Sequence, residues 1–149
     1  GPMMAPATFR RIYKPRLQRL IREIKQRTKA KVYLHSCGSI YRLIPDLIEI
    51  GVDILNPVQV NAAEMDSARL KKEFGADLSF WGGGCDPVVM GTGTVQQVRD
   101  DVKRRIYDLA PGGGFIFGSV HNIQANVPPE NIVAMFDAAL EFGGYPIRG

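Results

Sequence analysis

The chain has 149 residues, of which 45% are hydrophobic and 23% are charged, a balance typical of a globular domain. We expect a single domain over residues 1–149, long enough to bury its own core. No apolar run reaches the roughly 18 residues of a membrane-spanning helix, so we expect no membrane segment. The first 31 residues are too charged for a signal peptide, and two widely spaced cysteines then indicate free thiols in a reducing cytoplasm.

The net charge of +4 is unevenly distributed along the sequence. Residues 1–31 contain ten Lys/Arg and one acid, Glu23; of the 19 Lys/Arg and 15 Asp/Glu in the chain, nine and fourteen remain for the other residues. A basic helix of this kind is able to touch nucleic acid or an anionic ligand, but a solvated charged face is the simpler interpretation. We therefore do not expect nucleic acid as a partner.

Hydrophobic periodicity and turn residues predict helices alternating with short strands. In chain order we expect a helix over 8–28 that kinks or begins at Pro15, a strand over 32–36, a helix over 40–50, a strand over 52–55, a helix over 67–74, a strand over 78–81, a helix over 95–109, a strand over 115–118 and a helix from 129 onward. Asp66 and the Thr94–Gln97 capping box mark two helix starts, and Pro45 is placed to open a further helical turn.

The last helix is expected to point Ile132, Val133, Phe136 and Leu140 inward. The strands are short and apolar, as in a parallel sheet covered by helices. The order of the elements therefore predicts an α/β fold of four βα units preceded by one helix.

Both histidines and both cysteines fall where a predicted strand gives way to a helix. His35 and Cys37 end the first strand, Cys85 follows the third, and His121 follows the fourth. Strand alternation places His35 and Cys37 on the same face, and in parallel α/β folds this rim is where ligands bind. A zinc site with three ligands and one open position is therefore a candidate, with His35, Cys37 and either Cys85 or His121 as ligands.

These residues also have plainer interpretations. Cys85 suits a small residue at the edge of the core, and His121 suits a neutral group that orients a substrate carboxylate. A nucleophilic Cys/His pair is less favoured, because residues two apart on one strand need not face each other.

Glycines and polar residues occupy the same rim. Gly82, Gly83 and Gly84 lack the spacing of a phosphate-binding loop, so we expect them to allow close backbone approach to a bulky ligand. Five polar residues there are candidates to contact a polar ligand: Asn56, Gln59, Asp86, Asn122 and Gln124.

Five ordered motifs resemble the C-terminal half of the uroporphyrinogen decarboxylase superfamily, and a turn at residues 1–6 resembles the one that precedes a helix there. The motifs are His35-Ser-Cys-Gly38, Gly51-Val-Asp-Ile-Leu-Asn-Pro57, Gly82-Gly-Gly-Cys-Asp-Pro87, Pro111-Gly-Gly-Gly114 and His121-Asn-Ile-Gln124. The superfamily contains decarboxylases and zinc-dependent methyltransferases that work with methylated corrinoid proteins and thiols. The resemblance implies half of a (β/α)8 barrel, a fold of typically about 250 residues.

The resemblance implies a zinc-dependent methyltransferase, in which His35 and Cys37 match the His-x-Cys zinc ligands. The further cysteine ligand of the methyltransferases is replaced here by Ser119 to His121, so Cys85 or His121 substitutes for it, or zinc is not bound. We take Cys85 as the third metal ligand and His121 and Asp86 as the catalytic candidates. The alternatives are a decarboxylase in which His121 contacts a porphyrinogen, and a non-catalytic domain that binds a tetrapyrrole or a partner.

A half-barrel implies partners. The expected ones are a tetrapyrrole or a methylated small molecule, and a methyl-corrinoid that is free or carried by a protein. Because two parallel sheet edges and the inner face would be exposed, we also expect self-association or a missing N-terminal half. The catalytic aspartate and the substrate-binding arginines of the decarboxylases lie in that N-terminal half.

Overall fold

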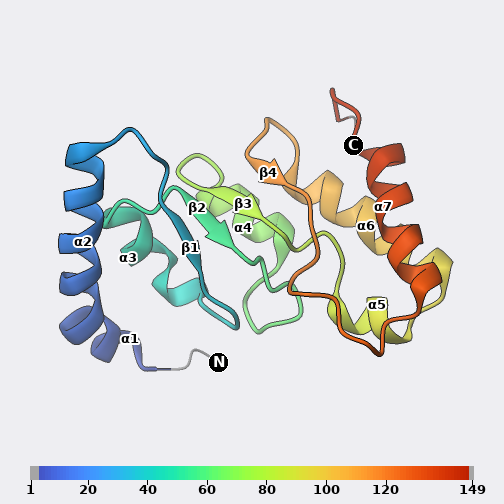
Figure 1. Ribbon diagram of the computed structural model, residues 1–149, viewed down its shortest axis with the longest axis horizontal. Helices are drawn as coiled ribbons and strands as arrows, with labels where there is room; N and C mark the ends of the chain where they lie inside the picture. The colour runs from blue at the N-terminus through green and yellow to red at the C-terminus, as the bar shows by residue number, and fades with distance from the viewer. Residues whose placement is uncertain (1–3, 148–149) are drawn as a thin grey trace.

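A computed structural model describes residues 4–147, so part of the turn expected at residues 1–6 lies outside the described residues. Strands and helices alternate along the chain (Figure 1). The elements are α1 (Pro6–Thr8), a π-helical turn η1 (Phe9–Tyr13), α2 (Lys14–Arg27), β1 (Tyr33–His35), a 3-10 turn η2 (Tyr41–Leu43), α3 (Ile44–Glu49), β2 (Ile54–Asn56), α4 (Ser67–Phe74), β3 (Ser79–Trp81), α5 (Pro87–Thr92), α6 (Val95–Leu109), β4 (Phe115–Ile116) and α7 (Pro129–Phe142).

The four strands form one parallel sheet in the order β1-β2-β3-β4. In Figure 1 α3, α4 and α6 lie behind this sheet, whereas α2 and α7 stand at its two ends. This arrangement confirms the predicted series of four parallel βα units and corresponds to half of a (β/α)8 barrel.

Helix starts follow the local capping signals of the sequence. The side chain of Asp66 accepts a hydrogen bond from Arg69 N at the start of α4, and Thr94 and Gln97 form the predicted capping box of α6. Pro45 lies in the first turn of α3, where its missing N–H has no helical partner to lose. Pro15 likewise lies in the first turn of α2, so the α-helix begins there after the π-helical turn.

The predicted helix α7 is present, but its expected inward face is wrong for three of the four residues; only Ile132 packs against the core, and it is partly buried. Val133 and Phe136 are exposed, and Leu140 has 83% of its surface exposed. The opposite face of α7 packs against α6 through smaller side chains, which allow the two helices to approach closely. The buried residues of this face are Asn131, Ala134, Met135 and Ala138.

The first helical segment shows the same partial burial. Phe9 and Ile21 enter the core beneath β1, β2 and β3, whereas four other residues of the predicted apolar stripe are exposed. These are Ile12, Tyr13, Leu20 and Ile24.

The sheet has a covered face and an open face. Leu55 and Phe80, in register on β2 and β3, are fully buried against the helices. Because side chains alternate along a strand, the neighbouring positions face the other way, and Tyr33, Trp81 and Ile116 are exposed there. The rings of Tyr33 and Trp81 meet edge to face with centroids 5.2 Å apart. The face of the sheet that would line the inside of a barrel is therefore apolar and exposed to solvent.

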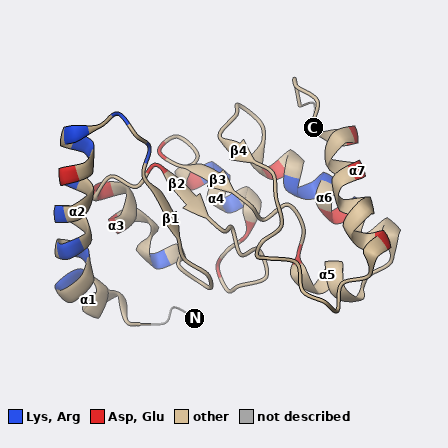
Figure 2. Cartoon of the chain, viewed as in Figure 1, with Lys and Arg blue, Asp and Glu red and all other residues tan. Residues whose placement is uncertain are grey.

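Figure 2 shows that Lys and Arg gather on α2. Several of these cations are held in ion pairs with the neighbouring α3 and the loop before β2. Lys14 contacts Asp46 at 2.8 Å, as does Arg10 of the preceding turn η1 at 2.9 Å, and Lys25 lies 2.8 Å from Asp53. Part of the basic charge therefore anchors α2 to the fold. No helix within residues 4–147 is long and apolar enough to cross a membrane.

Candidate metal centre

His35 and Cys37 meet at the carboxyl end of β1. His35 is the last residue of the strand and is paired in register with Asn56 of β2. Cys37 follows two residues later, and its Sγ lies 3.4 Å from His35 Nε2. The side-by-side placement expected from strand alternation is therefore present.

His121 joins this pair from the loop after β4. The rings of His35 and His121 have centroids 6.0 Å apart, and one ligand atom from each of His35, Cys37 and His121 lies within 4.8 Å of the others. The loop holds His121 partly through Ser119, whose Oγ donates a hydrogen bond of 2.6 Å to the His121 carbonyl. Cys37 and His121 are 84 positions apart in the sequence, yet they meet at one rim of the sheet.

The donor set suits zinc. Two imidazoles and one thiolate are ligands that zinc prefers, and three protein ligands leave one position open, as in catalytic zinc sites. In a tetrahedral site with Zn–N about 2.0–2.1 Å and Zn–S about 2.3 Å, a nitrogen and a sulfur ligand lie roughly 3.5 Å apart. The Cys37–His35 separation of 3.4 Å matches this spacing. The other two separations are within 4.8 Å, so they would shorten by at most about 1.5 Å to reach tetrahedral spacing.

Asn56 contacts the cluster through His35 rather than reaching into the cavity. Its Oδ1 lies 2.7 Å from His35 Nδ1, and its Nδ2 donates a 3.0 Å hydrogen bond to the carbonyl of Trp81. The residue is buried. The amide therefore connects the ends of β1, β2 and β3.

Cys85 does not join the three clustered residues. It is buried at the start of the segment that leads into α5, and its Sγ donates to the Asp86 carbonyl at 3.7 Å. Burial raises the pKa of the Cys85 thiol far above its usual range, and the nearby Asp101 carboxylate adds to this shift. A thiol that stays protonated is a poor ligand and a poor nucleophile.

Asp86, which we expected to be catalytic, caps the start of α5. Its carboxylate accepts a hydrogen bond of 2.8 Å from Val88 N and so caps α5, while its own N–H donates to Asp101. An aspartate directly before Pro87 is an N-cap signal, and it could have revealed the six-residue helix α5.

The glycines after β3 approach protein rather than open space. A Cβ added to Gly82 would lie 2.8 Å from the Ser119 carbonyl oxygen, and one added to Gly83 would lie 2.6 Å from that of Val58. A Cβ at Gly84 would meet the ring of Phe117. These glycines therefore let the loops after β2, β3 and β4 pack together beneath the cluster.

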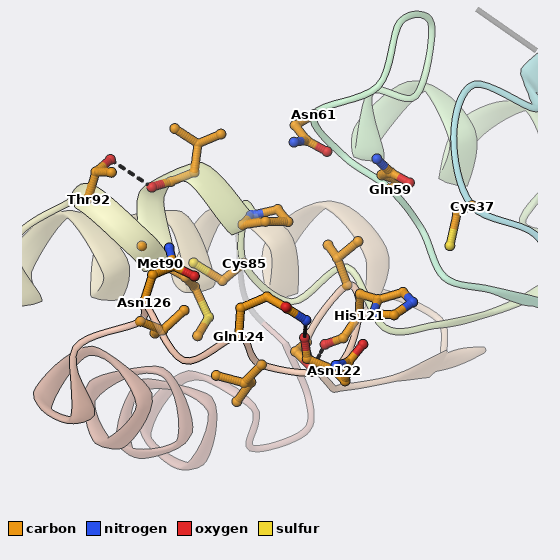
Figure 3. A pocket seen from close by; sticks show the side chains of 17 residues that line it. Cys37, Gln59, Asn61, Cys85, Met90, Thr92, His121, Asn122, Gln124 and Asn126 are labelled. Atoms are coloured by element: carbon orange, nitrogen blue, oxygen red, sulfur yellow. Dashed lines mark hydrogen bonds between the residues drawn. The ribbon is translucent and has the colours of Figure 1, made fainter.

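A cavity of about 640 Å³ opens beside the cluster (Figure 3). Cys37 and His121 lie at one side of it, and Met90 and Asn126 lie at the other. Its polar lining consists largely of side-chain amides, and within residues 4–147 no Lys, Arg, Asp or Glu contributes to its wall. The amides are Gln59, Asn61, Asn122, Gln124 and Asn126.

Gln59, Asn122 and Gln124 are thus placed as the sequence predicted, at the rim beside the candidate metal ligands. Asn61, Asn126 and the residues of α5 were not predicted to belong to the site. Asn61 and Asn126 lie in irregular loops that have no periodic pattern. Their position therefore depends on the packing of the loops after β2 and β4.

Comparisons with known proteins agree with the fold and identify the family. Residues 1–142 match the family described as uroporphyrinogen decarboxylase (URO-D). A curated uroporphyrinogen decarboxylase of Alkalilimnicola ehrlichii is 38% identical over 56 residues, which are 38% of this chain and 15% of that protein. A methyltransferase from Methanosarcina mazei superposes with a TM-score of 0.67 at 21% identity, covering 95% of this chain and 39% of its own. The latter likeness concerns the fold, and the chain spans less than half of either relative.

Proposed function

Because the chain belongs to the uroporphyrinogen decarboxylase family, we propose that His35, Cys37 and His121 hold a zinc ion in a methyltransferase that moves a methyl group to or from a thiol. The observation that carries this proposal is the convergence of the three ligand atoms at one end of the sheet, beside a cavity. The shared fold with a protein described as a methyltransferase, from Methanosarcina mazei, supports methyl transfer as the type of reaction.

The thiolate and the two imidazoles of the cluster contribute different kinds of ligand in this proposal. Cys37 provides the anionic sulfur, and the two imidazoles provide neutral nitrogen ligands. A bound zinc ion would act as a Lewis acid that lowers the pKa of a substrate thiol and favours the nucleophilic thiolate. Among residues 4–147, no charged side chain lines the cavity wall. The negative charge of the substrate thiolate would therefore be balanced by the metal ion at the cluster.

The cavity accommodates the acceptor beside the cluster. Its amides are able to donate and to accept hydrogen bonds, so they would orient a polar substrate without competing for the metal. The methyl-corrinoid, free or bound to a carrier protein, would approach from the open side of the sheet. Corrinoid, carrier and thiol are parts of this proposal that rest on the family.

The second candidate is decarboxylation of a porphyrinogen, and the 38% identity to a curated decarboxylase favours it. His121 would then hydrogen-bond to a substrate carboxylate, and no metal is required. The amide-lined wall favours it less, because a substrate with carboxylates is usually held by Arg or Lys side chains.

Metal analysis of the purified protein, expressed with zinc in the medium, separates the two candidates. We expect about one zinc per chain in the wild type and in Cys85→Ala, and loss of zinc in Cys37→Ala. Retention in Cys37→Ala, or loss in Cys85→Ala, would show that the donor set is wrong. A wild type that takes up no zinc would favour the decarboxylase-like site around His121.

A further inference from the structure

The side chain of Asn56 can adopt only one orientation in this structure. One end of the amide faces the Trp81 carbonyl at 3.0 Å, and a carbonyl oxygen only accepts hydrogen bonds. The group that faces Trp81 must therefore be the NH₂ of Asn56. Its oxygen, Oδ1, then necessarily faces His35 Nδ1, at 2.7 Å.

This orientation determines where His35 carries its proton. An amide oxygen accepts only, so the nitrogen opposite it, Nδ1, must be the donor. In a neutral imidazole one nitrogen is protonated and the other has a free lone pair. The lone pair therefore lies on Nε2, which is the nitrogen that faces Cys37 Sγ at 3.4 Å.

We propose that Asn56 is a positioning residue that holds His35 in the Nδ1–H tautomer and so presents Nε2 to the metal. This inference rests on the zinc site proposed above and deepens it. Metal-bound histidines generally donate their second N–H to an oxygen, and loss of that partner typically costs 10–100-fold in metal affinity. Here the partner is an amide on the next strand, itself fixed by a backbone carbonyl on the strand after that.

Two substitutions of Asn56 separate this role from simple structural support. Asn56→Asp and Asn56→Leu both remove the donor to the Trp81 carbonyl, but only aspartate keeps an oxygen that accepts from His35 Nδ1. Zinc affinity is measured by competition with a chromophoric chelator. We expect Asn56→Leu to bind zinc about 10–100-fold more weakly than the wild type. Asn56→Asp should bind zinc at least as tightly as the wild type.

Asn61→Leu serves as a matched control, because this exposed asparagine lines the same cavity, whereas the His35 ring nitrogens face Asn56 and Cys37. We expect its zinc affinity to equal that of the wild type. Equal weakening in Asn56→Asp and Asn56→Leu, or no weakening in either, would overturn the proposal. Far-ultraviolet circular dichroism of each variant checks that the fold is retained.

A second readout needs no metal. In zinc-free wild-type protein, ¹⁵N NMR of the His35 ring should show a protonated Nδ1 and an unprotonated Nε2. The Asn56→Leu variant, if folded, should lose this preference. A ring protonated at Nε2 alone would refute the inference. If the wild type shows the Nδ1–H tautomer but binds no zinc, the proposed function fails while the positioning role of Asn56 stands.

Discussion

Replacement of Gly83 by alanine should destabilise the protein more than replacement of Gly112, although both glycines have a left-handed backbone. Their φ angles are +83° and +75°. A Cβ at Gly112 meets nothing within 4 Å, whereas one at Gly83 would lie 2.6 Å from the carbonyl oxygen and 2.7 Å from the Cβ of Val58. Gly112→Ala therefore measures the cost of backbone strain alone, and Gly83→Ala measures backbone strain together with crowding.

The expected sizes follow from these two contributions. Left-handed geometry costs an alanine roughly 1–2 kcal/mol, and the less flexible unfolded chain offsets about 0.4–1 kcal/mol of this. With mid-range values, Gly112→Ala should lose about 1 kcal/mol of unfolding free energy. Val58 is fully buried, so any movement away from the new Cβ would push it against packed neighbours. Crowding of this kind typically costs a further ~1–3 kcal/mol, which gives about 2–4 kcal/mol for Gly83→Ala.

Urea unfolding followed by far-ultraviolet circular dichroism measures both losses, with wild type and variants at one protein concentration. A change in the slope of the free energy with urea would show that the unfolded or native ensemble had changed as well. Equal losses in the two variants would refute the packing of the loop after β3 against the loop after β2. The zinc content of Gly83→Ala then reports whether this packing supports the cluster.

Three further predictions follow from charge, burial and the open face. A thiol reagent should modify Cys37 much faster than Cys85, because burial raises the pKa of the Cys85 thiol, and zinc should protect Cys37. Burial alone would raise the pKa of Asp46, but hydrogen bonds from Lys14 and Arg10 outweigh this and lower it. The stability that Asp46→Asn removes should therefore be full above about pH 4, the unfolded value, and vanish as the pH falls through the lower folded pKa. Sedimentation velocity should show self-association that weakens in Trp81→Glu, since Trp81 lies on the open face of the sheet.

Each of these predictions has a contrary result. Equal modification rates of the two thiols would mean that Cys85 is accessible. A pH-independent difference between wild type and Asp46→Asn in urea unfolding would mean that the ion pairs do not contribute to stability. A protein that remains monomeric at high concentration would show that the open face tolerates water.

Local signals in the sequence were sufficient for most of the fold. Asp66 and the Thr94–Gln97 pair mark the starts of α4 and α6, because capping depends on residues within one helical turn. The burial of α7 was predicted wrongly, since periodicity identifies an apolar face but not the surface that meets it. In α7 both faces contain apolar residues, and the face with Ala134 and Ala138 packs more closely on α6.

The candidate site was predictable in part for the same physical reason. Strand alternation is a local property, so it predicted that His35 and Cys37 lie side by side, although β1 itself ends at His35. The choice between Cys85 and His121 depends on the paths of two loops, and these depend on contacts between residues far apart in sequence. The contacts of Asn56 were hidden as well, because its hydrogen-bonding partners lie on the two neighbouring strands.

The helices at the two ends of the sheet restrict which partner can complete a barrel. In a (β/α)8 barrel one helix covers the outside between each pair of neighbouring strands. If two copies closed a barrel about a two-fold axis, β4 of one copy would pair with β1 of the other, and α7 and α2 would compete for one position. A segment that begins and ends with a strand, with three helices between its four strands, would meet no such obstruction. If a second segment completes the barrel, the two flanking helices therefore argue against two copies of this chain in a symmetric ring. They favour a segment that has fewer helices than strands.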